Sequence, residues 1–308
     1  MDFLYMLEKI RIPGLNEIML GITTLGEETA FLIIALIIFW CVDKRRGYLL
    51  MAVGFMGTIF NQYLKLTFRV PRPWVRDPNF TILEQAREAA GGYSFPSGHT
   101  TMAVGTFGTL AATEKRKWLV AVFAAVAVMV GFSRMYVGVH TPADVLVGAL
   151  TSVLLILAFK PVLYGENNPL IYALLGFMLM MALAFFAYVE LYQFPADMDS
   201  HNLESGVKNA YTMLGCVTGA VVVYFVEGRV VHFDEKGKWW VQLIKIVGGI
   251  LVVLAIKEGM RFPLEWIFGG HMIARAVRYF LIVLVAGIFW PMTFKLWNTF
   301  AEKRQKNG

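Results

Sequence analysis

Residues 169–192 read PLIYALLGFMLMMALAFFAYVELY, an apolar run whose one charged residue is Glu190. A helix needs roughly 20 such residues to cross the hydrocarbon core of a bilayer, so this stretch predicts a membrane span. Eight further apolar runs predict spans at about 25–42, 47–67, 97–113, 118–136, 141–160, 207–227, 239–258 and 274–297. We therefore expect an all-α protein, a polytopic transmembrane helical bundle of about nine spans.

The composition of the 308 residues indicates the same class. Hydrophobic residues make up 57 %, charged residues 16 %, and the mean hydropathy is +0.59. Because a soluble domain carries about 25 % charged residues, a soluble globule and a disordered chain are both excluded. The net charge of +6 is expected to orient membrane loops rather than to bind nucleic acid. Cys41 and Cys216 both lie in apolar runs, which excludes a disulfide scaffold.

The basic residues between the apolar runs predict the orientation in the membrane. They form four clusters: Lys44–Arg46, Lys115–Lys117, Arg229 with Lys236 and Lys238, and Lys295 with Lys303, Arg304 and Lys306. All four fall on one side of a nine-span bundle, and basic loops are typical of the cytoplasmic side. The expected location is a bacterial plasma membrane, with the N-terminus outside and the C-terminus in the cytoplasm.

Three segments with different roles are predicted along the chain. They are an interfacial amphipathic N-terminal segment (1–24), a membrane core that carries the polar motifs (25–160), and additional transmembrane helices (161–308). Charges at Asp2, Glu8 and Glu17 exclude a cleavable signal peptide, and a frayed terminus is the alternative for this segment. Gly215 and Gly219 have the spacing that lets two membrane helices approach closely.

Three polar motifs stand out within the predicted core. The first is KLTFRVPRP, from Lys65 to Pro73; the second is PSGH, from Pro96 to His99; the third joins Ser133-Arg134 to His140 and Asp144. Charged groups near membrane spans are costly and often functional. The order of the spans places all three motifs on the outer face, so we expect them to form one pocket there.

The residue types in these motifs suit phosphoryl transfer. Lys65, Arg72 and Arg134 would form a cationic cradle for a phosphate, and the two arginines can each donate parallel hydrogen bonds. Ser97 and Gly98 open a predicted helix, where unpaired backbone N–H groups favour an anion, and glycine lets the phosphate approach the backbone. No metal or other cofactor is expected, because side chains already supply the positive charge.

The two histidines are expected to have different roles. Thr141 and Pro142 fit the N-cap and the first position of a helix. Asp144 would then lie in the first turn and contact one ring nitrogen of His140, which makes the other nitrogen a better nucleophile. His99 has no acidic neighbour in its motif and is the expected general acid.

Other basic residues and histidines are expected to have no role in this chemistry. Single basic residues at span ends usually extend to the interface, which is the expectation for Arg69, Arg76 and Lys257. His201 and His271 are expected to be solvated residues of outer loops, and His232 of an inner loop.

The three motifs resemble, residue for residue, the three-part signature of the type-2 phosphatidic acid phosphatases. The resemblance covers roughly residues 47–160. It implies a helical bundle and a phosphohistidine intermediate on His140, with His99 as the acid. It further implies that the phosphate ligands are Lys65, Arg72, Ser97, Gly98 and Arg134.

The resemblance leaves the substrate open, because the signature residues contact only the phosphate. Two spans before the first motif and four beyond the core resemble the layout of the glucose-6-phosphatase and sphingosine-phosphate phosphatase branch. The outer loop Phe68–Phe95, with Trp74 and Tyr93, is expected to read the rest of the substrate.

Several functions are compatible with these residues. The first hypothesis is a phosphatase acting at the outer leaflet on a lipid phosphate or diphosphate, such as undecaprenyl diphosphate, phosphatidate or phosphatidylglycerol phosphate. Two alternatives are a phosphotransferase with a lipid or sugar hydroxyl as acceptor and a sugar-phosphate phosphatase. An anionic-lipid transporter or scramblase would need the cations but not His140 with Asp144. The sequence carries no indication of the oligomeric state.

Overall fold

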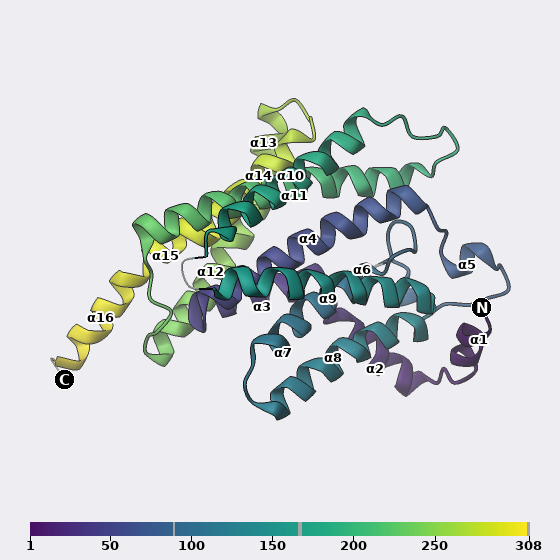
Figure 1. Ribbon diagram of the computed structural model, residues 1–308, viewed down its shortest axis with the longest axis horizontal. Helices are drawn as coiled ribbons and strands as arrows, with labels where there is room; N and C mark the ends of the chain where they lie inside the picture. The colour runs from purple at the N-terminus through teal and green to yellow at the C-terminus, as the bar shows by residue number, and fades with distance from the viewer. Residues whose placement is uncertain (89, 166–167, 307–308) are drawn as a thin grey trace.

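The computed structural model describes residues 1–88, 90–165 and 168–306, and these residues form helices and connecting loops without a strand (Figure 1). The side chains of residues 303–306 lie outside this description, among them the predicted basic residues Lys303, Arg304 and Lys306. The all-α prediction is confirmed.

Ten helical segments make up the first half of the chain. They are α1 (Asp2–Lys9), α2 (Pro13–Thr24), α3 (Glu28–Cys41), α4 (Lys44–Phe68), α5 (Pro73–Arg76), the 3₁₀ turn η1 (Glu84–Ala86), α6 (Gly98–Ala103), the π turn η2 (Val104–Gly108), α7 (Thr109–Thr113) and α8 (Lys117–Tyr136).

The remaining helices include two further π turns. They are α9 (Pro142–Tyr164), α10 (Leu170–Leu191), α11 (Ser200–Val226), the π turn η3 (Glu227–Val231), α12 (Trp239–Gly259), α13 (Arg261–Ile267), α14 (Ile273–Leu284), the π turn η4 (Val285–Phe289), α15 (Trp290–Met292) and α16 (Phe294–Lys306).

All nine apolar runs fold as helices, but they differ in length and polarity. Within the described residues, 6 helices are long and apolar enough to span a membrane, or 7 if the bent pair of α2 and α3 is one span. The predicted number of nine is therefore approximate. The α4 helix has 25 residues but carries Asn61 and Gln62 toward its C-terminal end, and the third run is divided among α6, η2 and α7.

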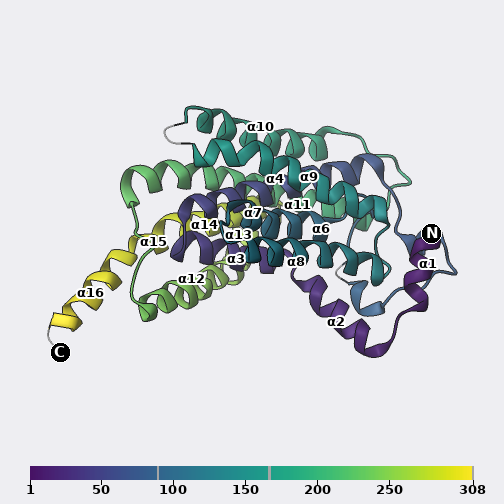
Figure 2. The ribbon, with the colours of Figure 1, turned by 60° about the horizontal axis from the view of Figure 1, so that its bottom comes forward.

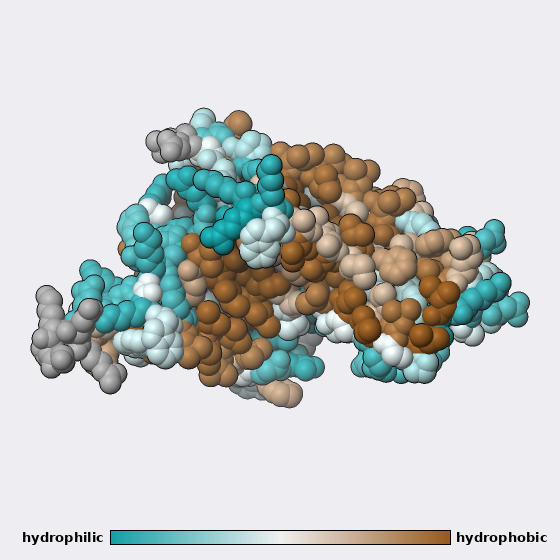
Figure 3. All heavy atoms as spheres, turned by 90° about the horizontal axis from the view of Figure 1, so that it is seen from below, coloured by the Kyte–Doolittle hydropathy of each residue, from teal (hydrophilic) through white to brown (hydrophobic). Residues whose placement is uncertain are grey.

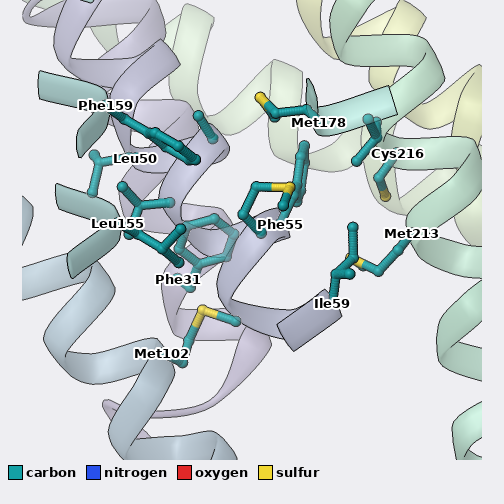
Figure 4. Packing of buried hydrophobic residues seen from close by; sticks show 14 of the residues in the cluster. Phe31, Leu50, Phe55, Ile59, Met102, Leu155, Phe159, Met178, Met213 and Cys216 are labelled. Atoms are coloured by element: carbon teal, nitrogen blue, oxygen red, sulfur yellow. The ribbon is translucent and has the colours of Figure 1, made fainter. Parts of the chain in front are cut away.

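The α4 helix lies at the centre of the bundle. It packs against α3, α6, α9, α10 and α11, and its Phe55 and Ile59 lie among side chains from these neighbours, such as Phe31, Met102 and Met213 (Figure 4). Because lipid tails are as apolar as these side chains, close packing rather than transfer from water holds such helices together. This packing fixes the C-terminal end of α4, where Lys65 lies.

The N-terminal segment consists of two helices rather than one. Pro13 opens α2, since proline lacks the N–H that a continuing helix would need. Leu4 and Leu7 of α1 are buried, and Arg11 between the helices donates from Nε to the carbonyl oxygen of Tyr136 at 2.8 Å. The segment is therefore packed onto the core instead of frayed, while its position at a membrane interface stays a prediction.

The surface has the apolar band of a membrane protein. Seen from below, hydrophobic residues cover the middle of the molecule and hydrophilic residues gather toward its two ends (Figure 3). The N-terminus and the C-terminal helix α16 lie at opposite ends of the long axis in both ribbon views (Figures 1 and 2).

The α11 and α14 helices approach each other closely at Gly215 and Gly219, as the spacing of these glycines predicts. A Cβ atom on Gly215 would lie 2.1 Å from the backbone oxygen of Ala276, and one on Gly219 would lie 2.9 Å from Cβ of Val283. Small residues thus let the two backbones come together, which is the packing that the spacing of Gly215 and Gly219 predicts.

Replacing Gly215 with alanine should destabilise the protein. The added methyl group meets backbone rather than a movable side chain, and such overpacking costs roughly 1–3 kcal/mol. We expect Gly215→Ala to lower the apparent Tm of the purified protein in detergent. Gly176→Ala is the matched control, because a Cβ atom there has nothing within 4 Å; an equal loss of stability in both variants would contradict the close approach.

Candidate active site

The three motifs meet around one cavity of about 360 Å³ at the C-terminal end of α4. Five of the eight predicted site residues line it, namely Lys65, Arg72, Gly98, His99 and His140. The other three predicted residues, Ser97, Arg134 and Asp144, are buried beside it. Residues separated by about 80 positions in the sequence thus come together, as the order of the spans predicts.

The start of α6 is fixed by its N-cap and by its contact with α9. The Ser97 side-chain oxygen accepts hydrogen bonds from the backbone N–H of Thr100 at 3.4 Å and from the Thr100 hydroxyl at 2.9 Å. The backbone N–H of Ser97 donates to the carbonyl oxygen of Asp144 at 2.9 Å. A Cβ atom on Gly148 would lie 2.7 Å from the carbonyl oxygen of Ser97, so only glycine lets α9 pack this closely. The second and third motifs are therefore held in one rigid arrangement.

The carboxylate of Asp144 lies at the start of α9, in a capping box with Thr141. Its Oδ2 accepts from the Thr141 backbone N–H at 2.8 Å and from the Ser94 hydroxyl at 2.6 Å. The same oxygen lies 3.5 Å from Nδ1 of His140. That distance exceeds a normal hydrogen bond, because two shorter bonds already hold the oxygen in place. The carboxylate is positioned beside the ring with little freedom to move.

The guanidinium of Arg72 connects the loop between α4 and α6 to the ring of His140. Its Nη1 lies 2.8 Å from Nε2 of His140 and also donates to the carbonyl oxygen of Val139 at 3.0 Å. Its Nε and Nη2 donate to the carbonyl oxygens of Gly92 and Gly91. Gly92 has φ +73°, a left-handed conformation that favours glycine. The loop therefore presents its carbonyl groups to Arg72 and fixes the position of the cation.

The side chains of Arg72 and His140 are both buried, and burial lowers the pKa of each. Burial lowers the pKa of Arg72 to about 10, partly opposed by Asp144. Burial and the nearby cations Arg72, Arg134 and Lys65 hold the pKa of His140 well below its ordinary value of 6.5. The ring is then neutral at physiological pH. Since Nε2 faces the donor Arg72, the ring proton belongs on Nδ1, toward Asp144.

Several buried donors around the cavity have few or no acceptors in the protein. Lys65 Nζ donates to the carbonyl oxygen of Tyr93 at 2.6 Å, and Arg134 Nη1 donates to the Thr23 hydroxyl at 2.7 Å. Arg134 Nε and Nη2, together with His99 Nε2, have no hydrogen-bond partner among the residues that the structure describes. Buried polar atoms normally have partners, so these atoms are suited to an anionic ligand.

The cavity is also lined by polar residues outside the three motifs, among them Asn61, Glu28 and Ser205. Asn61 lies one helical turn before Lys65 and donates from Nδ2 to the Thr101 hydroxyl at 3.2 Å. The sequence does indicate Asn61, because a polar residue inside an apolar span is a candidate functional residue. Glu28, at the start of α3, and Ser205, on α11, also line the cavity, but they have no distinctive spacing relative to the motifs.

The predicted outer loop contributes more through its backbone than through its aromatic rings. The carbonyl groups of residues 91–93 bind Arg72 and Lys65. The Trp74 ring lies 5.9 Å from the Arg72 guanidinium and 5.2 Å from that of Arg87. The loop therefore positions the cations of the site, while the prediction that it reads the substrate stays untested.

Comparisons with known proteins match both halves of the chain. Residues 45–168 match the family described as PAP2 superfamily, and residues 211–303 match the one described as PAP2 superfamily phosphatase, transmembrane extension. The first match contains all three motifs. The second covers α12, α13 and α14 and most of α11.

Three curated proteins illustrate the similarity. The undecaprenyl-diphosphatase BcrC of Bacillus subtilis is 32 % identical over 46 % of this chain and 71 % of its own length. The phosphatidylglycerophosphatase B of Bacillus subtilis is 31 % identical over 49 % of this chain and 76 % of its own length. An undecaprenyl-diphosphatase of Sulfolobus acidocaldarius is 27 % identical over 46 % and 66 %, respectively. No solved structure gives a significant match.

Proposed function

Since this chain belongs to the PAP2 superfamily and is an integral-membrane phosphatase of that family, we propose that it hydrolyses a lipid phosphate or diphosphate through a phosphohistidine on His140. The observation that carries the proposal is the cavity in which two histidines and buried cations meet. The names of the similar proteins favour undecaprenyl diphosphate or phosphatidylglycerol phosphate as substrate, and phosphatidate has the same reacting group.

In the proposed first step, Nε2 of His140 attacks phosphorus and the bond from phosphorus to the leaving oxygen breaks. His99 donates its proton to that oxygen. Asp144 keeps the remaining proton of His140 on Nδ1 and stabilises the positive ring. Because Nε2 of His140 lies 2.8 Å from Arg72 in the structure, the bound phosphate must take over this hydrogen bond from the ring.

In the second step, water attacks the phosphohistidine and His99 accepts a proton from it. The bond between phosphorus and Nε2 breaks, which releases inorganic phosphate and restores the neutral ring. Lys65, Arg72 and Arg134 stabilise the charge on the phosphate oxygens in both steps. The donors of Arg134 without protein acceptors support this role.

Phosphate release by the purified protein in detergent tests the proposed substrate class. The panel is undecaprenyl diphosphate, phosphatidylglycerol phosphate, phosphatidate and glucose 6-phosphate. We expect the highest kcat/KM for one of the three lipids. Efficient hydrolysis of glucose 6-phosphate alone would contradict the lipid substrate, and transfer of phosphate to added glycerol in place of release would favour a phosphotransferase.

The reaction should not require a divalent metal ion. No group of three or more potential metal-ligating side chains occurs in the described residues, and the proposed cradle supplies three cations of its own. We expect activity to survive excess EDTA, and orthovanadate to inhibit by imitating the five-coordinate phosphorus on His140. Complete loss with EDTA and recovery with magnesium would contradict this mechanism.

The active site should face the outside of the cell. Asn79, in the outer loop, and Arg116, between α7 and α8, are both exposed and lie in loops of opposite predicted sides. A cysteine replacing Asn79 is expected to react with a membrane-impermeant maleimide in intact cells, and one replacing Arg116 only after lysis. A parent protein without Cys41 and Cys216 provides the background, and the opposite labelling pattern would place the site in the cytoplasm.

A further inference from the structure

A second cavity, of about 590 Å³, lies among α11, α12, α13 and α14. No residue of the three motifs lines it. Its charged lining consists of five cations and two carboxylates: Lys208, Lys257, Arg261, Arg275 and Arg278, with Glu258 and Glu265. The cavity therefore has an excess of positive charge within the transmembrane extension.

Two arginines in this cavity, Arg275 and Arg278, form no close ion pair with a carboxylate of the described residues. Arg278 is 9 % exposed, its Nε has no acceptor, and its Nη1 reaches the carbonyl oxygen of Lys257 only at 3.5 Å. Arg275 donates from Nε to the Thr212 hydroxyl at 2.7 Å. Within the described part of the chain, neither guanidinium lies within 4.0 Å of a carboxylate.

The other three cations of the cavity each lie within 4.0 Å of a carboxylate. Lys208 pairs with Glu204 at 2.6 Å, Arg261 with Glu265 at 3.3 Å, and Lys257 lies 3.8 Å from Glu258. Charges inside a membrane protein normally pair or mark a functional site, and an unpaired buried guanidinium is costly. Arg278, which is buried, and Arg275, which is half-buried, are thus the residues in this cavity that would gain most from an anionic ligand.

The second cavity is adjacent to the catalytic one but separate from it. Along α11, Ser205 and Asn209 line the catalytic cavity, and Lys208 between them lines the second one. Glu28 lines the catalytic cavity and lies close enough to Arg275 and Lys257 to interact with both electrostatically. The two cavities therefore share a wall near the outer end of the bundle.

One side of the α13 helix borders this cavity, and another side carries exposed aromatic residues. Arg261 and Glu265, four positions apart, line the cavity. Phe262 and Trp266, each one position further along, are 76 % and 85 % exposed. Tryptophan, such as Trp266, is enriched at membrane–water interfaces. The cavity is thus placed where a lipid headgroup can reach it while the acyl chains stay in the bilayer.

We propose that this cavity is a second phosphate-binding site, which binds the phosphate of an anionic lipid headgroup or free phosphate through Arg275 and Arg278. It is not a second catalytic centre, because His271, the one histidine in its lining, has no carboxylate arrangement like that of His140 and accepts from the Ile273 backbone N–H. His271 is exposed, as expected for a loop histidine, and it lines this cavity together with Lys257, the expected interface lysine. The proposal does not depend on the proposed substrate or mechanism.

Lipid binding measured by native mass spectrometry of the full chain in detergent tests this site. The probes are dihexanoyl phosphatidylglycerol, dihexanoyl phosphatidylcholine and inorganic phosphate. We expect the wild type to retain phosphatidylglycerol in preference to phosphatidylcholine, and Arg275→Gln with Arg278→Gln to weaken that retention about tenfold or more, since two charge-assisted donors are lost. Arg229→Gln with Lys236→Gln is the matched control, because it removes two exposed cations at the other end of the spans.

The two sources of phosphate give different results. Preference for phosphatidylglycerol that depends on Arg275 and Arg278 identifies a lipid headgroup. If binding of inorganic phosphate depends on Arg275 and Arg278, and neither lipid is preferred, the ligand is free phosphate. Binding of all probes unchanged in the double variant overturns the proposal. If the double variant does not fold, Arg275→Gln should still weaken binding and Arg278→Lys should retain most of it; equal binding by wild type and both single variants likewise overturns the proposal.

Discussion

His140→Ala is expected to abolish phosphate release from every substrate, with a loss of roughly 10,000-fold or more, as for other enzymes that lose a catalytic nucleophile. The substitution removes the ring that lies next to both Asp144 and Arg72. The cations of the cradle remain, so substrate binding should persist while the covalent step is lost. Phosphate release in detergent, compared at saturating substrate, measures the effect.

A second histidine provides the control for this variant. His201 lies at the start of α11, is exposed, and is outside the catalytic cavity. We expect His201→Ala to keep wild-type activity, and both variants to elute as folded protein with similar thermal stability. Substantial hydrolysis by folded His140→Ala would show that another group attacks the phosphorus.

His99→Ala is expected to reduce activity by an amount that depends on the leaving group. A positioned general acid contributes about 100- to 10,000-fold, and a leaving group of low pKa needs this help least. The variant should therefore lose most of its activity on a lipid phosphate but keep measurable activity on p-nitrophenyl phosphate, if the wild type accepts that ester. The free Nε2 of His99 at the cavity is consistent with a donor to the leaving oxygen.

The ratio of the two activities is the decisive quantity for His99. An equal loss on both esters, together with loss of a covalent intermediate, would assign His99 a role other than general acid. An increase in KM alone would make it a binding residue instead. Each of these outcomes is separable from a folding defect by the thermal stability of the variant.

Much of this site can be predicted from the sequence, because most of its residues lie in short local motifs. Thr141 and Pro142 predict the start of α9, and the observed capping box places Asp144 next to His140 as that start requires. The parity of the apolar runs predicts that the outer end of α4 and the start of α6 meet. Both predictions need only helix geometry and the length of a span.

Other features depend on tertiary contacts that no local pattern shows. Ser94 binds the Asp144 carboxylate from a loop 50 positions away, and nothing in its neighbours distinguishes it from other loop serines. The predicted number of spans is approximate partly because of α4. Asn61 and Gln62 make this helix more polar than a typical span, although it packs at the centre of the bundle. Lys257 has the sequence signature of an interface lysine, yet the packing of α12 against α14 brings it to a cavity.

The most direct test of the proposed mechanism is the identification of the phosphorylated residue. A lipid substrate labelled at the transferred phosphate is mixed with the purified protein, the reaction is quenched under alkaline denaturing conditions that preserve phosphohistidine, and the modified peptide is mapped by mass spectrometry. The mechanism predicts an acid-labile phosphate on His140 that is absent from His140→Ala and present in His99→Ala with a good leaving group. Label on His99, or turnover without any phosphorylated histidine, would contradict it.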